Sequence, residues 1–336
     1  MSDQATRRDF LKQAAAGAAA VSALAQEVVA QTTAAGPGGL PTRLLGRTGE
    51  RVSILALGGW HIGTIADETE AARFMHAALD EGITFFDNAW DYHDGRSEEL
   101  MGKALAMDGR RQKVFLMTKN CNRDYAGSMK CLEDSLRRLR TDHIDLWQFH
   151  EMVYDNDPDW VFEKGGIKAA LQARQEGKVR FIGFTGHKDP RIHLKMLGKP
   201  HEWDTAQMPI NVLDAHYRSF QKEVVPVCLQ KNVAVIGMKG FGGGDGIARG
   251  AGLSAAEAYG YALSQPVAAQ VVGMTSLEQL RDNVALARGF KPLSEAERKA
   301  LVERVREMAG DGRFELFKSS QTFDGPHHRR QHGFTA

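Results

Sequence analysis

Eight short apolar runs, each followed by a segment with helical periodicity, recur along the chain between residues 54 and 287. They lie at 54–57, 83–86, 114–118, 144–149, 179–184, 206–210, 233–238 and 269–272. Runs without polar alternation are typical of parallel strands that are buried on both faces. Strands that alternate with helices predict βαβ units, and eight such units predict a (β/α)8 TIM barrel.

The segments between these runs carry apolar residues at the spacing of amphipathic helices. We expect helices at 68–81, 98–106, 129–139, 166–176, 192–197, 224–231, 255–264 and 277–287, with an extra C-terminal helix at 294–308. Ser294, with Glu297 three residues later, predicts a capping box at the start of the extra helix. Residues 42–52, which include Gly46 and Gly49, predict an N-terminal β-hairpin that closes the bottom of the barrel.

A doubly wound open sheet is the alternative arrangement of the same units. A dinucleotide-binding sheet of that kind carries a Gly-x-Gly-x-x-Gly turn after its first strand. The turn here is Gly58-Gly59-Trp60, which does not fit that pattern. The barrel is therefore the favoured fold.

The N-terminus has a different composition from the rest of the chain. Arg7-Arg8, followed by Phe10-Leu11-Lys12 and an alanine-rich stretch at 14–25, resembles a twin-arginine (Tat) signal peptide. A disordered tail or an amphipathic helix is the alternative. We expect Tat-dependent export to the periplasm, with Arg7 and Arg8 binding the export machinery and cleavage near Ala25-Gln26. The apolar stretch is too short and too poor in Leu and Ile to leave a stable membrane anchor.

These features predict four parts: a signal peptide at 1–25, a Gly/Pro-rich linker at 26–41, the barrel at 42–310 and a C-terminal tail at 311–336. The tail contains His327, His328 and His332 beside two arginines, and is expected either to be solvated or to fold over the pocket, with a metal site in this cluster as the less favoured alternative. The net charge of +1 argues against a nucleic-acid-binding surface. The sequence predicts no metal site in the barrel.

Four polar residues follow successive apolar runs, where the strands of the barrel are expected to end. They are Asp87, Tyr92, Lys119 and His150. Barrel enzymes place their chemistry at this C-terminal face. A phenol, an amine, an imidazole and a carboxylate together indicate proton transfer. A nearby cation favours the phenolate, so we expect Lys119 to lower the pKa of Tyr92.

Several motifs in the same order resemble those of the aldo-keto reductases, over about residues 42–290. They are Asp87-x4-Tyr92, Ser97-Glu98, Gly102-Lys103-Ala104-Leu105, Ile144-Asp145-Leu146-x3-His150, Gly177-Lys178-Val179-Arg180-x-Ile182-Gly183, Gln207-x3-Asn211 and Asp282-Asn283. The resemblance implies an NAD(P)-dependent oxidoreductase that acts on a small carbonyl or alcohol, including sugars. Tyr92 would be the general acid and base, Lys119 and Asp87 would tune it, and His150 would orient the carbonyl.

The same resemblance implies a binding site for NADP(H) or NAD(H). Its expected residues are Thr185, Gln207, Asn211, Met238, Lys239, Gly240, Gly242, Gly243, Thr275, Gln279 and Asn283. Gly186 stands where the family has an amide side chain, and Met238-Lys239 where it often has a tyrosine. The loop that follows the last strand lacks the basic residues of NADP-preferring members, with Arg281 the nearest.

Trp60, His61 and Trp90 are expected to line the substrate pocket. A cofactor-binding regulatory or sensor protein on the same barrel is the alternative function, although an intact set of four catalytic residues argues against it. A metal-dependent barrel hydrolase would need clustered ligands at several strand ends, and only His150 with His61 or His187 is available.

Overall fold

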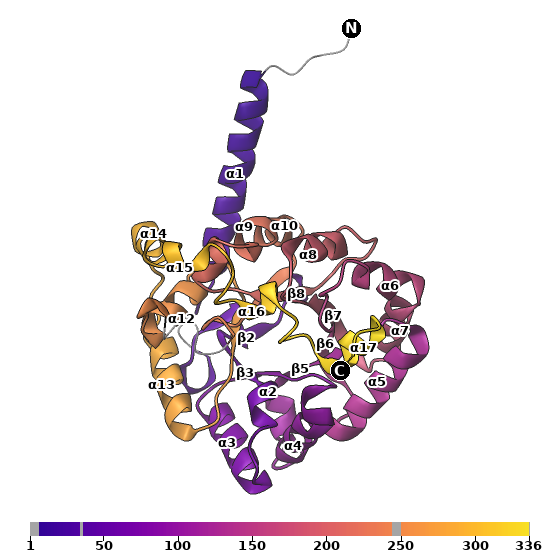
Figure 1. Cartoon of the computed structure of the whole chain (residues 1–336). Helices are drawn as coiled ribbons and strands as arrows, with labels where there is room; N and C mark the ends of the chain where they lie inside the picture. Colours follow the sequence, from indigo (N-terminus) through magenta and orange to yellow (C-terminus); the bar gives the residue numbers. More distant parts are fainter. Residues whose placement is uncertain (1–6, 34–35, 244–249, 336) are drawn as a thin grey trace.

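A closed barrel of eight parallel strands forms the centre of the protein (Figure 1). The computed structural model describes residues 7–33, 36–243 and 250–335. The strands pair in the order β10-β3-β4-β5-β6-β7-β8-β9. They are β3 (Leu55–Gly58), β4 (Phe85–Asp87), β5 (Phe115–Asn120), β6 (Ile144–Phe149), β7 (Val179–Thr185), β8 (Thr205–Pro209), β9 (Ala234–Met238) and β10 (Ala269–Val272). The predicted (β/α)8 barrel is confirmed.

Helices surround the barrel on its outside (Figure 1). They are α2 (Gly59–Ile62), α3 (Glu68–Asp80), α4 (Arg96–Leu105), α5 (Tyr125–Leu139), α6 (Asp157–Glu163), α7 (Gly166–Gln175), α8 (Pro190–Leu197), α9 (Phe220–Glu223), α10 (Val225–Gln230), α12 (Ala255–Leu263) and α13 (Leu277–Arg288). The helix expected at 294–308 is divided at Val305 into α14 (Glu295–Arg304) and α15 (Arg306–Ala309). The capping box of Ser294 and Glu297 is present.

Burial explains why these segments became strands and helices. Trp147, Phe149 and Phe184 face the helices in the outer core. Phe85 and Phe115 fill the barrel interior, with ring centroids 5.2 Å apart. Because both faces of each strand are covered, the apolar runs are continuous rather than alternating.

The expected hairpin is present at the bottom of the barrel. Strands β1 (Thr42–Leu44) and β2 (Arg51–Ser53) pair antiparallel. Leu45 and Val52 belong to the same buried cluster as the barrel interior. The hairpin therefore contributes apolar side chains that close this end of the core.

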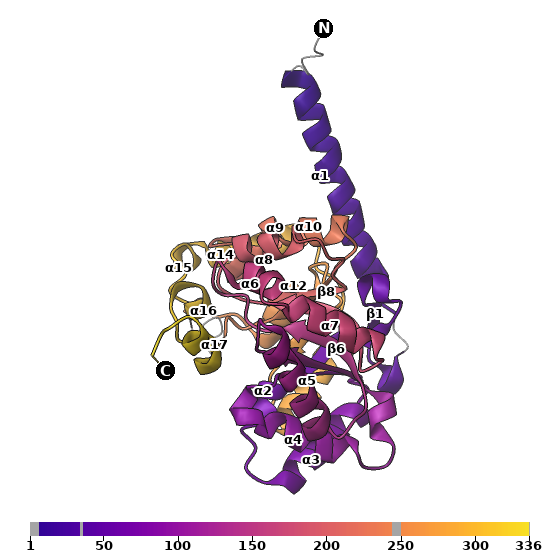
Figure 2. The ribbon, with the colours of Figure 1, turned by 90° about the vertical axis from the view of Figure 1, so that its right-hand side faces the viewer.

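Helix α1 (Arg7–Ala30) extends away from the barrel (Figures 1 and 2). The bond between Ala25 and Gln26 lies inside this helix. Residues 26–41, expected as a linker, include its last turn, a bridge between Thr33 and Thr42, and the fully buried Leu40. Among the described helices, none combines the length and apolar character needed to cross a bilayer.

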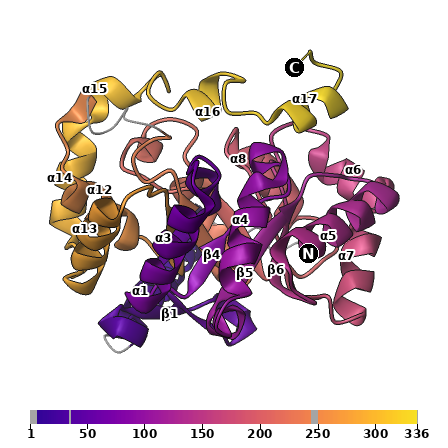
Figure 3. The same ribbon diagram turned by 90° about the horizontal axis from the view of Figure 1, so that it is seen from below.

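The C-terminal tail crosses the end of the barrel opposite the hairpin (Figure 3). It contains two short helices, α16 (Leu316–Ser319) and α17 (Pro326–Gln331). Phe317, Lys318 and His328 of the tail are almost completely buried. Of the two expectations for this segment, folding over the pocket is therefore the one observed.

Candidate active site

Neighbouring strands bring Asp87 and Lys119 together. Asp87 is the last residue of β4 and pairs in register with Met117, two residues before Lys119 on β5. Both side chains are buried and form an ion pair. Lys119 Nζ also donates to the carbonyl oxygen of Asn88 (2.7 Å) and lies 3.3 Å from the hydroxyl oxygen of Tyr92. The cation thus links the carboxylate to the phenol.

Tyr92 and His150 complete this group of four. Tyr92 begins a tight turn whose next two residues, His93 and Asp94, have positive φ. His150 directly follows β6, and its backbone N–H donates to the carbonyl oxygen of Asn120 (2.8 Å). The ring centroids of Tyr92 and His150 are 5.5 Å apart, with the rings at 74°. The structure therefore gathers all four expected catalytic side chains at the C-terminal face.

The pKa of Tyr92 differs from the expectation. Burial raises it well above 10, and the negative charges of Asp87 and Asp91 add to the effect. Lys119 does not reverse this shift because Asp87 compensates its charge in the same ion pair. The phenol is therefore protonated at neutral pH, which is the form that a proton donor requires.

His150 has two polar neighbours that the motifs did not identify as site residues. Its Nδ1 lies 3.1 Å from Oδ1 of Asp91 and 3.4 Å from Sγ of Cys121. Burial lowers the pKa of His150, while Asp91 acts in the opposite direction. Asp91 immediately precedes Tyr92 in sequence. An acidic residue next to the expected catalytic tyrosine was the available signal for it.

The expected carboxamide-binding residues lie at the ends of adjacent strands. Thr185 ends β7 and pairs in register with Gln207 on β8, and both are buried. Nε2 of Gln207 donates to Oδ2 of Asp87 (2.9 Å), whereas its Oε1 is buried without a hydrogen-bond partner among the described residues. A buried acceptor of this kind fits the amide N–H of a nicotinamide. Asn211 instead binds Glu315 of the tail through Nδ2 (3.1 Å).

Gly186 has a steric explanation. A Cβ atom at this position would overlap the carbonyl oxygen of Met152. The amide side chain found here in the family therefore cannot be accommodated. His187, the next residue, is buried and faces Asp324 of the tail (3.4 Å).

The loop after β9 begins with a tight turn. Lys239, Gly242 and Gly243 all have positive φ, at 54°, 79° and 73°. Met238 and Gly240 lie at the end of β9 and in the same loop, the glycine buried. The N–H of Gly242 donates to the carbonyl oxygen of Lys239 (2.8 Å), which closes the turn.

The third part of the expected cofactor site lies after β10. Thr275 precedes α13, and its N–H donates to Oε1 of Gln279 (2.9 Å). Asn283 lies one turn further along α13 and is half-buried. These three residues therefore occupy the β10 side of the mouth, apart from Thr185 and Gln207 on β7 and β8.

The three expected pocket residues occupy different places. Trp60 is 48% exposed, with its ring centroid 6.4 Å from that of Tyr92. His61 is exposed and packs against Gly273. Trp90 donates from Nε1 to Asp134 (3.2 Å) and packs edge-on against His327 of α17. Of the three, Trp60 is thus placed against Tyr92.

The tail forms several polar contacts above the site. The backbone N–H of Gly325 donates to Oε2 of Glu151 (2.8 Å), and Asp324 pairs with Lys188 (2.7 Å). The ring of His328 lies 5.3 Å from that of His150. His332 binds Asp157 (3.0 Å). The histidines of the C-terminal cluster are therefore separated, and His328 is the one that reaches the site.

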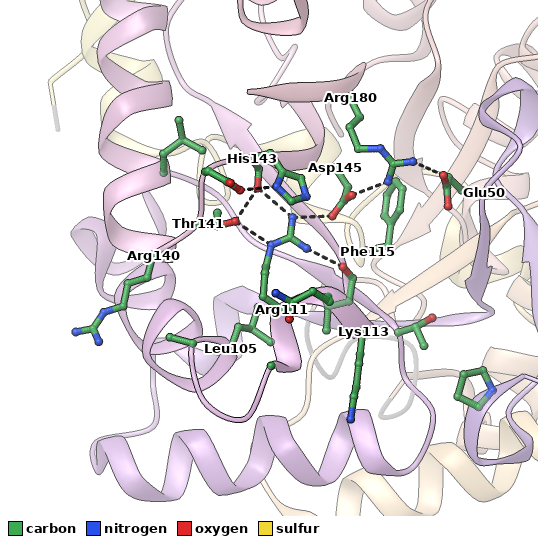
Figure 4. A pocket seen from close by; sticks show the side chains of 18 of the residues that line it. Glu50, Leu105, Arg111, Lys113, Phe115, Arg140, Thr141, His143, Asp145 and Arg180 are labelled. Carbon is green, nitrogen blue, oxygen red and sulfur yellow. Dashed lines mark hydrogen bonds and ion pairs between the residues drawn. The ribbon is translucent and has the colours of Figure 1, made fainter. Parts of the chain in front are cut away.

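A cavity of about 1660 Å³ lies at the opposite, hairpin end of the barrel (Figure 4). Asp145 at its wall pairs with Arg111 (2.9 Å) and Arg180 (2.7 Å), and accepts from the backbone N–H of Leu116 (2.8 Å). Arg180 also pairs with Glu50 of the hairpin region. The Arg180–Glu50 pair links the hairpin to the barrel. Because the bottom face of such barrels serves stability, we place the candidate active site at Asp87, Tyr92, Lys119 and His150 instead.

A parallel barrel with a phenol, an ammonium, a carboxylate and an imidazole at its C-terminal face defines a barrel oxidoreductase. The sequence profile of the aldo/keto reductase family matches residues 54–247. The chain belongs to the aldo/keto reductase family. Members of this family work with NAD(H) or NADP(H).

Individual relatives agree with this assignment. The uncharacterized oxidoreductase YrpG of Bacillus subtilis is 32% identical over 230 residues, covering 60% of this chain and 66% of YrpG. The 6-dehydroglucose reductase of Novosphingobium aromaticivorans is 34% identical over 168 residues, covering 45% of this chain and 53% of its own. The chain thus spans less than two thirds of these curated relatives. The holo form of aldo-keto reductase AKR11C1 from Bacillus halodurans superposes with a TM-score of 0.67 at 29% identity, over 78% of this chain and 95% of its own.

Proposed function

We propose that this protein is an NAD(P)-dependent oxidoreductase that interconverts a small carbonyl compound and its alcohol, with Tyr92 as general acid and base. The observation that carries the proposal is the contact of the Tyr92 hydroxyl with Lys119, at 3.3 Å, beside the Lys119–Asp87 ion pair. This arrangement can donate a proton and hold the resulting phenolate next to a fixed cation.

The residues divide the reaction between them. A bound nicotinamide supplies or accepts the hydride at the carbonyl carbon. Tyr92 donates the proton that the carbonyl oxygen takes up during reduction, and removes it again during oxidation. Lys119 stabilises the phenolate form of Tyr92, and Asp87 holds Lys119 in place. His150, 5.5 Å from Tyr92 between ring centroids, orients the carbonyl oxygen and stabilises its developing charge.

Gln207 and Thr185 would hold the carboxamide of the nicotinamide. The unpartnered Oε1 of Gln207 supports this role, since it needs a donor. The glycines of the β9 loop would approach the pyrophosphate. Thr275, Gln279 and Asn283 are uncharged, so none of them offers a positive charge to the 2′-phosphate that distinguishes NADP(H) from NAD(H).

A sugar-like substrate fits the rim of the site. The exposed face of Trp60 lies next to Tyr92, and flat indole surfaces provide large, rigid contact area. The name of the Novosphingobium relative, a 6-dehydroglucose reductase, is consistent with a polyhydroxylated carbonyl compound. A cofactor-binding sensor with little turnover is a second candidate, which the covering of the site by the tail favours.

Export through the Tat system is the second part of the proposal. Arg7 and Arg8 would bind the export machinery, and cleavage near Ala25-Gln26 would release the barrel into the periplasm. This route passes folded proteins, so the nicotinamide would be loaded before export. Changing both arginines to lysine keeps the charge and should retain the protein in the cytoplasm. Equal export of the variant would contradict this localisation.

Replacement of Tyr92 tests the catalytic proposal. Tyr92→Phe should lower hydride transfer to a panel of aldehydes and sugars by roughly 10²–10⁴-fold, the usual contribution of a general acid. Cofactor binding should remain, which a fluorescence titration can measure. The matched control is Tyr125→Phe, an exposed tyrosine on α5 whose hydroxyl binds Gln172. Full activity of Tyr92→Phe would overturn the assignment.

A further inference from the structure

Four side chains with metal-binding atoms meet beneath α17. They are Asp91, Cys121, His150 and His328, and one potential ligand atom from each lies within 4.8 Å of all the others. Nδ1 of His150 lies 3.1 Å from Asp91 and 3.4 Å from Cys121, and Nε2 of His328 lies 3.9 Å from Asp91. Bond lengths at tetrahedral zinc place neighbouring ligand atoms about 3.3–3.6 Å apart. The His150–Cys121 pair already matches this spacing, and pairs that lie further apart, within the 4.8 Å limit, would have to move together on binding.

One ring nitrogen in the cluster is buried without a hydrogen-bond partner among the described residues. It is Nε2 of His328. The His328 side chain is completely buried, and this nitrogen lies 3.7 Å from Oε2 of Glu151 and 3.9 Å from Oδ2 of Asp91. Buried polar atoms are nearly always satisfied in folded proteins. A cation at the centre of the cluster would satisfy this nitrogen.

Arg123 lies next to Nδ1 of His328, so the other ring nitrogen, Nε2, remains available to bind a metal ion. Its Nη2 lies 3.4 Å from Nδ1 of His328. That nitrogen carries two hydrogens, and the carbonyl oxygens of His150 (2.8 Å) and Glu151 (3.0 Å) accept them. The charge of Arg123 is paired with Asp157 at 3.0 Å. Nε and Nη2 of Arg123 are thus bound to other groups, whereas its Nη1 is buried without a hydrogen-bond partner among the described residues. The opposite side of the His328 ring faces the cluster.

Asp91 also lacks a permanent counter-charge. Within the described part of the chain, its ion-pair partners are His150 and His328, with no lysine or arginine. The neighbouring Lys119 is already paired with Asp87. A divalent cation would therefore enter a site in which only histidines pair with the Asp91 carboxylate, and in which Oε2 of Glu151 lies 3.7 Å from His328.

We propose that Asp91, Cys121, His150 and His328 form a zinc-binding site that is complete only when the C-terminal tail covers the barrel. Imidazole nitrogen and thiolate sulfur select zinc over the hard cations magnesium and calcium. On binding, Cys121 releases its proton to solvent and coordinates as the thiolate. Three ligands belong to loops of the barrel and the fourth to α17, so the ion cross-links the tail to the barrel.

Zinc binding has a consequence for catalysis that rests on the proposed function. The ion would hold His150 and keep the tail closed over Tyr92. The zinc-bound protein would then be an inhibited form, and removal of the metal would restore turnover.

Metal binding can be measured on the full chain without substrate or nicotinamide. After equilibrium dialysis against Zn²⁺ we expect one ion per chain. Co²⁺ in its place should give the visible bands of a tetrahedral ion and a thiolate charge-transfer band. Cys121→Ser and His328→Ala should each lower the affinity at least tenfold. Retention of no ion, or equal binding by both variants, would overturn the site.

Matched controls use the same residue types close by. Cys131→Ser changes a buried cysteine on α5, and His327→Ala changes the neighbouring histidine of α17, which packs on Trp90. Both should bind zinc as the wild type does. His328→Ala lies in the tail, so it remains informative if Cys121→Ser does not fold. Zinc should also slow proteolysis of the tail in the wild type and not in His328→Ala. These readouts hold even if Tyr92→Phe shows the catalytic proposal to be wrong.

Discussion

The side-chain amide of Gln207 donates to Oδ2 of Asp87 across 2.9 Å. The other oxygen of Asp87 pairs with Lys119, and the other end of the Gln207 amide, Oε1, is buried without a partner among the described residues. One glutamine therefore connects the ion pair of the catalytic group to the expected position of the nicotinamide carboxamide.

Replacement of Gln207 by leucine should weaken cofactor binding. Loss of one hydrogen bond that leaves a buried partner unsatisfied costs about 1–3 kcal/mol, so we expect Kd to rise roughly tenfold to a hundredfold. A fluorescence titration with NADH and NADPH measures this. Gln148→Leu is the matched control, because Gln148 on β6 also has a buried, unpartnered Oε1 and donates to Thr205 (2.9 Å). An equal loss in both variants would show that Gln207 has no special role.

Variants of the buried Lys119–Asp87 ion pair can distinguish a role in catalysis from a role in stability. Lys119→Met leaves the Asp87 carboxylate buried without its partner, which costs about 3–5 kcal/mol of unfolding free energy. Adding Asp87→Asn removes that charge and should restore most of the stability. Activity should remain low in the double variant, because Tyr92 still lacks its cation. Denaturant unfolding and kcat measured on both variants check this, and recovery of kcat with stability would mean that Lys119 has only a structural role.

The barrel itself could be predicted from the sequence because its signal is local. The run at 144–149 and the run at 269–272 became β6 and β10 with the predicted bounds. The predicted bounds are wrong where a capping side chain, rather than the apolar pattern, determines the residue at which a helix begins. For example, α5 begins at Tyr125 instead of 129, because Asp124 caps its N-terminus by accepting from Gly127.

The covering of the site could not be predicted in this way. Helices α16 and α17 have four and six residues, too few to show a periodic pattern. His328 is buried through contacts with residues about two hundred positions earlier, such as Arg123. Sequence motifs predicted the positions of Tyr92 and His150, but the pKa of Tyr92 depends on its burial and on the charges of Asp87 and Asp91, which the folded structure places near it.

Phe317 should control how firmly the tail covers the cofactor loop. It is completely buried and packs so closely that a Cβ on Gly243 would lie 2.8 Å from its ring. Phe317→Ala removes a buried aromatic ring, a change that costs about 3–5 kcal/mol. We expect faster proteolysis of the tail and faster cofactor exchange in stopped-flow measurements. Phe334→Ala, an exposed phenylalanine of the same tail, should change neither rate. Unchanged exchange in Phe317→Ala would separate the tail from cofactor access.

The tail is also held by one buried cation that two carboxylates share. Lys318 Nζ lies 2.6 Å from Asp214 and 2.9 Å from Glu315, all of them buried. Burial raises the pKa of Glu315 to about 7; the charge of Asp214 adds to this, and Lys318 opposes it. The folded tail therefore retains a proton that the released tail, with a glutamate pKa of about 4.3, has already lost.

The sign of the pH effect follows from this difference. A raised pKa stabilises the attached tail below the pKa of the released state, and that contribution is lost as pH rises through about 7. Proteolysis of the tail should accordingly be slower at pH 6 than at pH 8. Glu315→Gln cannot ionise and leaves Lys318 to Asp214 alone, so its proteolysis rate should vary much less over this range. A wild-type rate that does not change with pH, or a glutamine variant that keeps the full dependence, would assign the anchoring to another group.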